Sequence, residues 1–248
     1  MFFLMNELYR GWAVRPKVIL HVGAHKAEEF STYKDLSPSK TYWIEANPTL
    51  ASQLSVHFKG DNSQEVIEAA AWDQDGLELE LIITNNTQSS SILELKKHKD
   101  LYPDIFEKKR VKVQTKKLDT LLLNKIAPDF INLDIQGSEL KALMGAQSLL
   151  ANCKWIYTEV NKVEIYEGCC LVEDLDKYLS DLGFRRECTR WFGHDGWGDA
   201  LYVHQEKSKK RTIKNKYYMI FFQTKWHSRK IIHFFLSKLR TLIRKISS

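Results

Sequence analysis

Short apolar runs and helix-like stretches alternate along most of the chain. The apolar runs, which are typical of strands buried inside a sheet, cover residues 17–22, 41–46, 64–72, 129–134 and 154–160. Apolar and polar residues alternate, as in half-exposed strands, in residues 77–83 and 110–118, and we expect these two strands to pair. Two later strand patterns, 184–191 and 199–204, follow each other with no helix between them.

Helical patterns separate most of the strands, at residues 27–36, 138–150 and 171–182 and after Asn47-Pro48. Asn47 can cap a helix, Pro48 suits its first turn, and Gly183 suits the end of the last helix. Strands that alternate with helices predict an α/β fold with a doubly wound, mostly parallel sheet, and the two late strands predict a closing antiparallel hairpin. Ligands bind to such a sheet at the carboxyl ends of its strands.

Charge divides the chain into two unlike parts. The net charge is +6, but residues 207–248 hold thirteen Lys and Arg and no Asp or Glu. The other 24 of the 37 basic residues stand against 31 acidic ones, which leaves that part at −7. We therefore predict a lead-in segment (1–16), an acidic α/β domain (17–205) and a basic, amphipathic helical tail (206–248).

The tail has the pattern of a helix that binds a surface. Across residues 231–246 the apolar side chains recur on one helical stripe, whereas Lys230, Arg240, Arg244 and Lys245 lie elsewhere. This arrangement favours binding to an anionic membrane surface through residues 207–248. Packing on the protein's own domain or in a homo-oligomer is the second interpretation, and nucleic-acid binding is the least favoured.

The cysteines indicate a compartment rather than a site. Cys153, Cys169, Cys170 and Cys188 do not combine with histidines at zinc-ligand spacing. We therefore expect reduced thiols in a cytoplasmic protein. Together with the tail, this predicts a peripheral position at the inner face of a membrane.

The residues after the first two strands are candidates for one wall of a nucleoside site. Gly23, Ala24 and His25 follow the first strand, and a glycine there lets the backbone approach a ligand closely. The dinucleotide pattern G-x-G-x-x-G is absent, so this turn is not a phosphate cradle and, taken alone, also fits an ordinary corner. Glu45 follows the second strand, 22 residues after Gly23. A carboxylate at that place can accept hydrogen bonds from both ribose hydroxyls.

Small and acidic residues follow the next two strands. Ala70 and Ala71 leave room for backbone groups to read an adenine edge, and Trp72 either covers that ring or packs in the core. Asp134 ends an apolar strand, which makes it a strong candidate for chemistry. Glu139 is a candidate substrate contact, although an acid is favoured in the first turn of any helix.

The late strands add five polar or aromatic candidates: Glu159, Asn161, His194, Trp197 and Asp199. Because the carboxyl ends of parallel strands meet at one rim, we expect them to share a site with Asp134. The candidate bases are Asp134, Glu159 and His194. The candidate substrate contacts are Glu139, Asn161, Trp197 and Asp199.

The ordered motifs resemble one known family. The segments VGAH, WIEANP, NLDIQGSELKALMGAQSLL, YTEVN and GWGDALY, spread over roughly residues 17–205, are similar to those of FkbM-type methyltransferases. The resemblance implies a Rossmann-like class I methyltransferase fold, with a seven-stranded sheet, and S-adenosylmethionine as the cofactor. It also implies that the cofactor is held by Gly23, Ala24, His25, Glu45, Ala70, Ala71 and Asp134.

Two positions depart from the family pattern. His21 stands where an acid is common directly before Val-Gly-Ala, and Ala27 stands where a glycine is common. Two alternatives therefore stay open. One is a non-catalytic membrane- or nucleic-acid-binding adaptor with a vestigial cofactor fold. The other is an NAD-dependent oxidoreductase, against which the absence of G-x-G-x-x-G argues.

The resemblance further implies methyl transfer to oxygen, often on sugars. An alcohol is a poor nucleophile until it loses its proton, so a carboxylate or histidine is needed to accept that proton. Asp134 and Glu159 could also hold a divalent cation, which would lower the pKa of the acceptor hydroxyl, but the sequence does not require one. With the tail, the expected function is O-methylation of a sugar hydroxyl of a glycan or glycolipid at a membrane surface.

Overall fold

The computed structural model describes residues 5–192 and 196–208. The chain divides into two compact units, of which residues 15–208 form the α/β unit. Of the other unit, residues 5–14 are described, and they hold helix α1 (Met5–Trp12). The predicted tail from residue 209 onward and His194 lie outside the described residues. No helix within the described ranges is long and apolar enough to span a bilayer.

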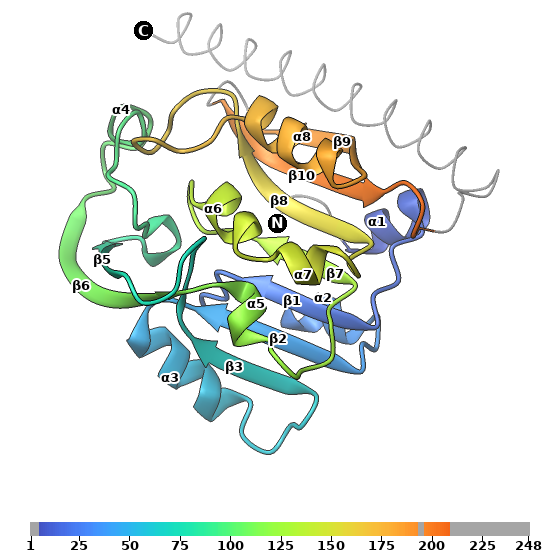
Figure 1. The fold of residues 1–248 in the computed structure, drawn as a ribbon. Coiled ribbons are helices and arrows are strands. Elements are labelled where there is room, and N and C mark those ends of the chain that lie inside the picture. The colour runs from blue at the N-terminus through green and yellow to red at the C-terminus, as the bar shows by residue number, and fades with distance from the viewer. Residues whose placement is uncertain (1–4, 193–195, 209–248) are drawn as a thin grey trace, which may run out of the picture. The chain divides into compact units, whose positions relative to one another are not determined.

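A seven-stranded sheet forms the centre of the α/β unit (Figure 1). Its strands, in spatial order, are β3 (Gln64–Glu68), β2 (Lys40–Glu45), β1 (Val18–Val22), β7 (Phe130–Leu133), β8 (Trp155–Asn161), β10 (Trp197–His204) and β9 (Phe184–Trp191). Strand β10 is antiparallel to both of its neighbours, and the other pairs are parallel. The predicted doubly wound sheet with a closing antiparallel hairpin is confirmed. The chain order reverses between β1 and β7, which is where such sheets bind ligands.

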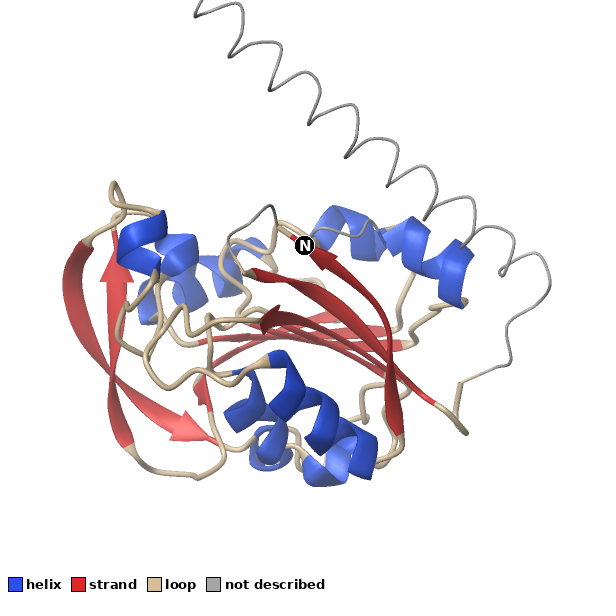
Figure 2. Ribbon diagram, turned by 90° about the horizontal axis from the view of Figure 1, so that it is seen from above, coloured by secondary structure: helices blue, strands red, loops and turns tan. Residues whose placement is uncertain are grey.

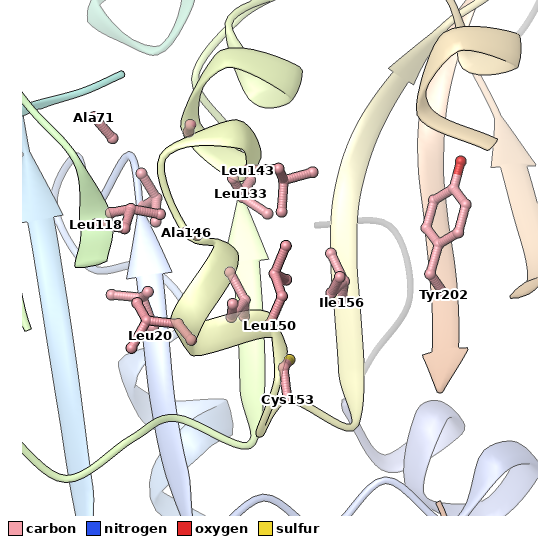
Figure 3. Close-up of a cluster of buried hydrophobic side chains, with 14 of the residues drawn as sticks. Leu20, Ala71, Leu118, Leu133, Leu143, Ala146, Leu150, Cys153, Ile156 and Tyr202 are labelled. Atoms are coloured by element: carbon pink, nitrogen blue, oxygen red, sulfur yellow. The ribbon is translucent and has the colours of Figure 1, made fainter. Parts of the chain in front are cut away.

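Helices cover both sides of this sheet, as Figure 2 shows. Four of them bury apolar side chains in one cluster with Leu20, Leu133 and Ile156 of the strands (Figure 3). These helices are α5 (Leu118–Leu121), α6 (Glu139–Met144), α7 (Gln147–Leu150) and α8 (Val172–Asp181). Because side chains alternate along a strand, Trp43 of β2 points to the opposite face. There it stacks on Tyr33 of α2 (Phe30–Lys34), with ring centroids 5.6 Å apart.

A second, three-stranded sheet has the order β4-β6-β5. Its strands are β4 (Ala70–Ala71), β5 (Glu78–Thr84) and β6 (Glu107–Lys116). The antiparallel pairing of β5 with β6 confirms the pairing expected for the two alternating segments. The single strand predicted at 64–72 is wrong, because it divides at Ala69, whose N–H donates to the carbonyl oxygen of Glu45 at 3.0 Å. The chain then leaves β2 and joins β6.

Two of the predicted helices are shorter than their patterns indicate. The first begins only at Phe30, because His25 and Ala27 have positive φ angles of 47° and 56°. The helix predicted at 138–150 is broken between α6 and α7, where a Cβ on Gly145 would overlap the carbonyl oxygen of Trp72. The helix predicted after Asn47 is α3 (Pro48–His57), and the Asn47 side chain accepts from the N–H of Thr49, as expected for a cap. Short helices η1 (Thr87–Ser89) and α4 (His98–Leu101) lie in the segment between β5 and β6.

Candidate active site

A pocket of about 490 Å³ opens at the carboxyl ends of β1, β2, β7 and β8. Its size is that of a small-molecule site, and its position is the one expected for an α/β sheet. The predicted residues that line it are Gly23, His25, Glu45, Ala70, Ala71, Asp134, Glu159, Trp197 and Asp199. The described lining leaves out four others: Ala24, Trp72, Glu139 and Asn161.

The turn after β1 is held between its two neighbouring strands. Gly23 and Ala24 both donate their N–H groups to the carbonyl oxygen of Ile44, at 2.9 and 3.0 Å. On the other side, the N–H of Asp134 donates to Val22 at 3.0 Å. Gly23 has a φ of 88°, and a Cβ there would overlap the carbonyl oxygen of Asp134. Glycine is therefore required both by the dihedral angle and by the approach of another backbone.

Glu45 is fixed by two backbone groups at the end of β2. One carboxylate oxygen accepts from the N–H of His25 at 2.7 Å, and the other accepts from the N–H of Asn47 at 2.8 Å. Burial raises the pKa of Glu45, although these two hydrogen bonds act in the opposite direction. Each oxygen keeps a further lone pair. The group can thus accept hydrogen bonds from two neighbouring hydroxyls of a ligand in the pocket.

The His25 side chain ties this turn to the segment that follows β5. Its Nδ1 lies 2.7 Å from a carboxylate oxygen of Glu28, and its Nε2 lies 2.7 Å from the hydroxyl of Thr87 in η1. The sequence placed His25 among the cofactor contacts. Both ring nitrogens already have protein partners. The parts of His25 left to contact a cofactor are therefore its backbone and the C–H edge of its ring.

One amide links the two central carboxylates. Nε2 of Gln136 donates to Asp134 at 2.6 Å and to Glu159 at 3.0 Å. The hydroxyl of Tyr166 donates to Oε1 of Gln136 at 2.5 Å. Because an ionised carboxylate such as Asp134 can only accept, the NH₂ group of the amide faces it, and Oε1 is left to accept from Tyr166. The sequence analysis assigned no role to Gln136 or Tyr166, although Gln136 lies inside the LDIQGSEL motif.

Glu159 sits in an environment that favours its protonated form. Burial raises its pKa well above the ordinary value, and the charges of Asp134, Glu139 and Asp199 raise it further. Asp199 in turn accepts a hydrogen bond from the hydroxyl of Tyr157. The pocket therefore holds a group of carboxyl side chains that can share a proton.

Three predicted contacts take other places. Glu139 is fully buried and accepts from the N–H groups of Ile135 (3.1 Å) and Gly137 (3.0 Å), so it supports the loop that carries Gln136. Trp72 lies under the Nζ of Lys141, 5.8 Å from its ring centroid, outside the pocket lining. The substrate contact expected of Asn161 has no support either, since it is 1% exposed within β8.

Among the residues that the structure describes, no group of three or more His, Cys, Asp or Glu side chains has the arrangement of a metal site. Asp134 and Glu159 are instead spaced by the amide of Gln136.

Comparison with known proteins decides the family. The family described as "Methyltransferase FkbM domain" matches residues 21–186, from the end of β1 to the start of β9. The chain belongs to the FkbM methyltransferase family. Its domain is therefore an S-adenosylmethionine-dependent methyltransferase, and the NAD-dependent alternative is set aside.

Individual relatives of this FkbM methyltransferase are distant. The 2-O-methyltransferase NoeI of Sinorhizobium fredii (strain NBRC 101917 / NGR234) is 26% identical over 163 residues, which cover 61% of this chain and 66% of the relative. The match thus spans slightly less than two thirds of that protein. Among solved structures, TrmK of M. capricolum, in complex with S-adenosyl-homocysteine, is 8% identical with a TM-score of 0.45, covering 87% of this chain and 80% of that one. ChlM of Synechocystis PCC 6803, a magnesium protoporphyrin IX methyltransferase with bound SAM, is 12% identical with a TM-score of 0.43, covering 82% and 76%.

The pocket of this FkbM methyltransferase fits its cofactor. Glu45 has two oxygens available for a ribose diol, and Gly23 lines the pocket beside it while its missing Cβ makes room for the carbonyl oxygen of Asp134. The small Ala70 and Ala71 line the side that an adenine ring would occupy. A wall that carries carboxylates also suits a sulfonium cation.

The two departures from the family pattern have local explanations. His21 is 2% exposed, and its Nδ1 lies 3.0 Å from the hydroxyl of Tyr33, which also accepts from Asn132 at 2.8 Å. Burial lowers the pKa of His21, so a neutral imidazole replaces the acid in this FkbM methyltransferase. Ala27 has a φ of 56°, a region in which glycine is less strained than alanine.

Glu45→Gln is expected to weaken the binding of S-adenosylhomocysteine about tenfold or more. The amide would turn an NH₂ group toward one of two backbone N–H donors and lose an acceptor for the ribose. Titration calorimetry measures the effect. Glu68→Gln is the matched control, because Glu68 pairs in register with Glu45 but is exposed at the end of β3. Unchanged affinity in a folded Glu45→Gln variant would contradict the ribose role.

Glu139 is expected to make stability depend on pH between about 4.5 and 7. Burial raises its pKa from 4.5 to about 7, so the folded state binds the proton more tightly than the unfolded state. Its contribution is therefore complete below pH 4.5 and is lost as the pH rises to 7, by on the order of 3 kcal/mol. Urea unfolding at pH 5, 6, 7 and 8 should show a shallower decline for Glu139→Gln. The exposed Glu173→Gln should keep the wild-type slope, and equal slopes in all three proteins would refute this origin.

Proposed function

We propose that this protein transfers a methyl group from S-adenosylmethionine to a hydroxyl oxygen of a sugar. The observation that carries the proposal is the pair of carboxyl groups, Asp134 and Glu159, held by Gln136 beside the half of the pocket that suits the cofactor. Carboxylates at this place suit an acceptor that must lose a proton. The 2-O-methyltransferase relative supports oxygen as the acceptor atom.

Each group of the chain has a task in this reaction. When bound, the cofactor supplies an electrophilic methyl group on a sulfonium sulfur. Glu45 and the backbone at Gly23 hold its adenosine half, which fixes the distance to the acceptor. Asp134 accepts a hydrogen bond from the acceptor hydroxyl and takes its proton, while Gln136 keeps the carboxylate in place. Glu159, whose pKa is raised by burial and by its acidic neighbours, holds a proton nearby.

The test uses S-adenosylmethionine labelled in its methyl group. The full-length protein is incubated with neutral oligosaccharides, with RNA and with total protein as separate acceptors. We expect label in a sugar, in a form that survives alkali, since a methyl ether is stable where a methyl ester is not. Label in RNA or protein and none in sugar would overturn the proposal.

We further infer that the basic tail holds the enzyme at the inner face of a membrane, next to a glycolipid acceptor. Support comes from the sequence alone, because residues 209–248 lie outside the described residues. Twelve of the thirteen basic residues counted from Lys207 onward fall in this segment, which has no acid. Each Lys or Arg near an anionic membrane contributes about 1 kcal/mol.

Replacing Lys238, Arg240, Arg244 and Lys245 together by Gln is expected to reduce the fraction bound to anionic liposomes at least about tenfold. Sedimentation with phosphatidylglycerol-containing vesicles measures it, and methyl transfer to a soluble acceptor should be unchanged. The matched control replaces four exposed lysines of the α/β unit: Lys59, Lys108, Lys109 and Lys177. If the wild-type chain does not sediment with these vesicles even at low salt, the membrane proposal is wrong.

A further inference from the structure

The described wall of the pocket carries one sign of charge. Its acidic side chains are Glu28, Glu29, Glu45, Asp134, Glu159 and Asp199, and none of its described residues is a lysine or an arginine. The part of the chain outside residues 207–248, which holds this pocket, is also acidic, with a net charge of −7. A ligand in the pocket therefore meets several carboxyl groups, and the basic side chains among its described wall residues are histidines.

These acids are distributed between two halves of the pocket. Glu45 belongs to the cofactor half, at the ends of β1 to β3. Beyond Asp134, the wall is made by Glu159 of β8 and by residues near β9 and β10. Glu28 lies at the same pocket, and its side chain is 43% exposed, so it meets a ligand on its way in. An acceptor that enters the pocket therefore meets acidic side chains in both halves.

Aromatic rings form the rest of the acceptor half. Trp197 stacks on Phe192 with ring centroids 5.1 Å apart, and its Nε1–H donates to the hydroxyl of Tyr102 at 2.9 Å. These three residues line the pocket together with Tyr166. Flat aromatic faces suit the C–H face of a sugar ring, while carboxylates accept hydrogen bonds from its hydroxyls.

Glu28 keeps its negative charge at neutral pH. Burial acts to raise the pKa of Glu28, but the hydrogen bond with His25, the backbone N–H groups of residues 26 and 28 and the charge of His25 together lower that pKa. The carboxyl of Glu159 already responds to the charges of its neighbours by holding a proton more tightly. A further negative charge on an acceptor would be repelled by Glu28 and Asp134 with no described lysine or arginine in the wall to offset it.

We propose that this pocket selects acceptors without an anionic group. Neutral and amine-bearing sugars are accepted, and sugars that carry a phosphate or a carboxylate are rejected by Glu28 and Asp134. This inference rests on the proposed function, because it assumes a sugar acceptor. It narrows the substrate class to glycans whose reacting residue is uncharged or cationic.

The test compares matched acceptors with the full-length protein and methyl-labelled S-adenosylmethionine. The panel holds neutral hexose oligosaccharides, their 6-carboxyl and 6-phosphate counterparts, and amine-bearing counterparts. We expect kcat/KM for the neutral and amine-bearing members to exceed that for the anionic ones about tenfold or more. Repeating the assay at 1 M salt should reduce the difference, because charge repulsion is screened and steric exclusion is not.

A charge reversal adds a second measurement. Glu28→Lys should shift the anionic-to-neutral ratio upward about tenfold, whereas Glu173→Lys, at an exposed position of α8 outside the pocket, should leave it unchanged. Anionic members methylated as fast as neutral ones would overturn the inference and leave the proposed function standing. Label that enters RNA or protein but no member of the panel would instead overturn the proposed function, and this inference with it.

Discussion

Asp134→Asn is expected to lower kcat for methyl transfer by about 10²–10⁴-fold while the fold and the affinity for S-adenosylhomocysteine stay near wild type. The amide has the shape of the carboxylate but cannot take a proton from the acceptor. The backbone contacts of residue 134, with Val22 and over Gly23, are unaffected by the change. The Asn side chain can still accept from Gln136, which donates to this position at 2.6 Å.

The measurement is single-turnover transfer to the sugar that the acceptor panel identifies, with calorimetry for the cofactor product. Asp181→Asn is a matched control, because Asp181 is exposed at the end of α8, outside the pocket. A folded Asp134→Asn enzyme with full turnover would remove this residue from the proton transfer. Glu159, the other carboxyl held by Gln136, would then be the candidate proton acceptor.

Gly23→Ala is expected to destabilise the protein by about 2–5 kcal/mol and to abolish cofactor binding. Two costs combine at this position. An alanine at a φ of 88° is strained, and its Cβ would overlap the carbonyl oxygen of Asp134, which belongs to the backbone and cannot rotate away. This overlap can be relieved only if β1 and β7 move apart at the edge of the pocket.

Gly60→Ala separates the two costs. Gly60 has nearly the same φ, 89°, but a Cβ there would have no neighbour within 4 Å. It should therefore lose only the dihedral cost, about 1–2 kcal/mol, and bind the cofactor normally. Urea unfolding of both variants gives the difference, which reports the backbone overlap alone. Equal losses in the two variants would show that β1 and β7 yield easily at this point.

The sheet and one half of the site could be predicted because both follow from periodic patterns. Apolar runs separated by helical patterns are enough to predict an α/β fold with a mostly parallel sheet. Residues directly after a strand must then lie at its carboxyl end, which is why Gly23, Glu45 and Asp134 were found. The helix break at Gly145 was missed, because it results from a contact with Trp72 that is distant in sequence.

The other half of the site depends on loops, whose paths have no period. Gln136 turns back toward Asp134 and Glu159 from a loop residue with a φ of 55°. Tyr102 and Tyr166 reach the pocket from segments without a regular pattern. A polar residue between an acid and a glycine after a strand was the available signal for Gln136, but nothing in the local sequence showed which way its amide would face.

The position of β10 between β8 and β9 has a consequence for synthesis on the ribosome. While the chain grows, β8 and β9 emerge first, and the place between them stays empty until residues 197–204 leave the exit tunnel. A nascent chain in this state exposes an unpaired apolar strand edge, which is a target for chaperones and for aggregation. Trp197 and Asp199 arrive with that strand, so the wall of the pocket that they form is the last part to be put in place.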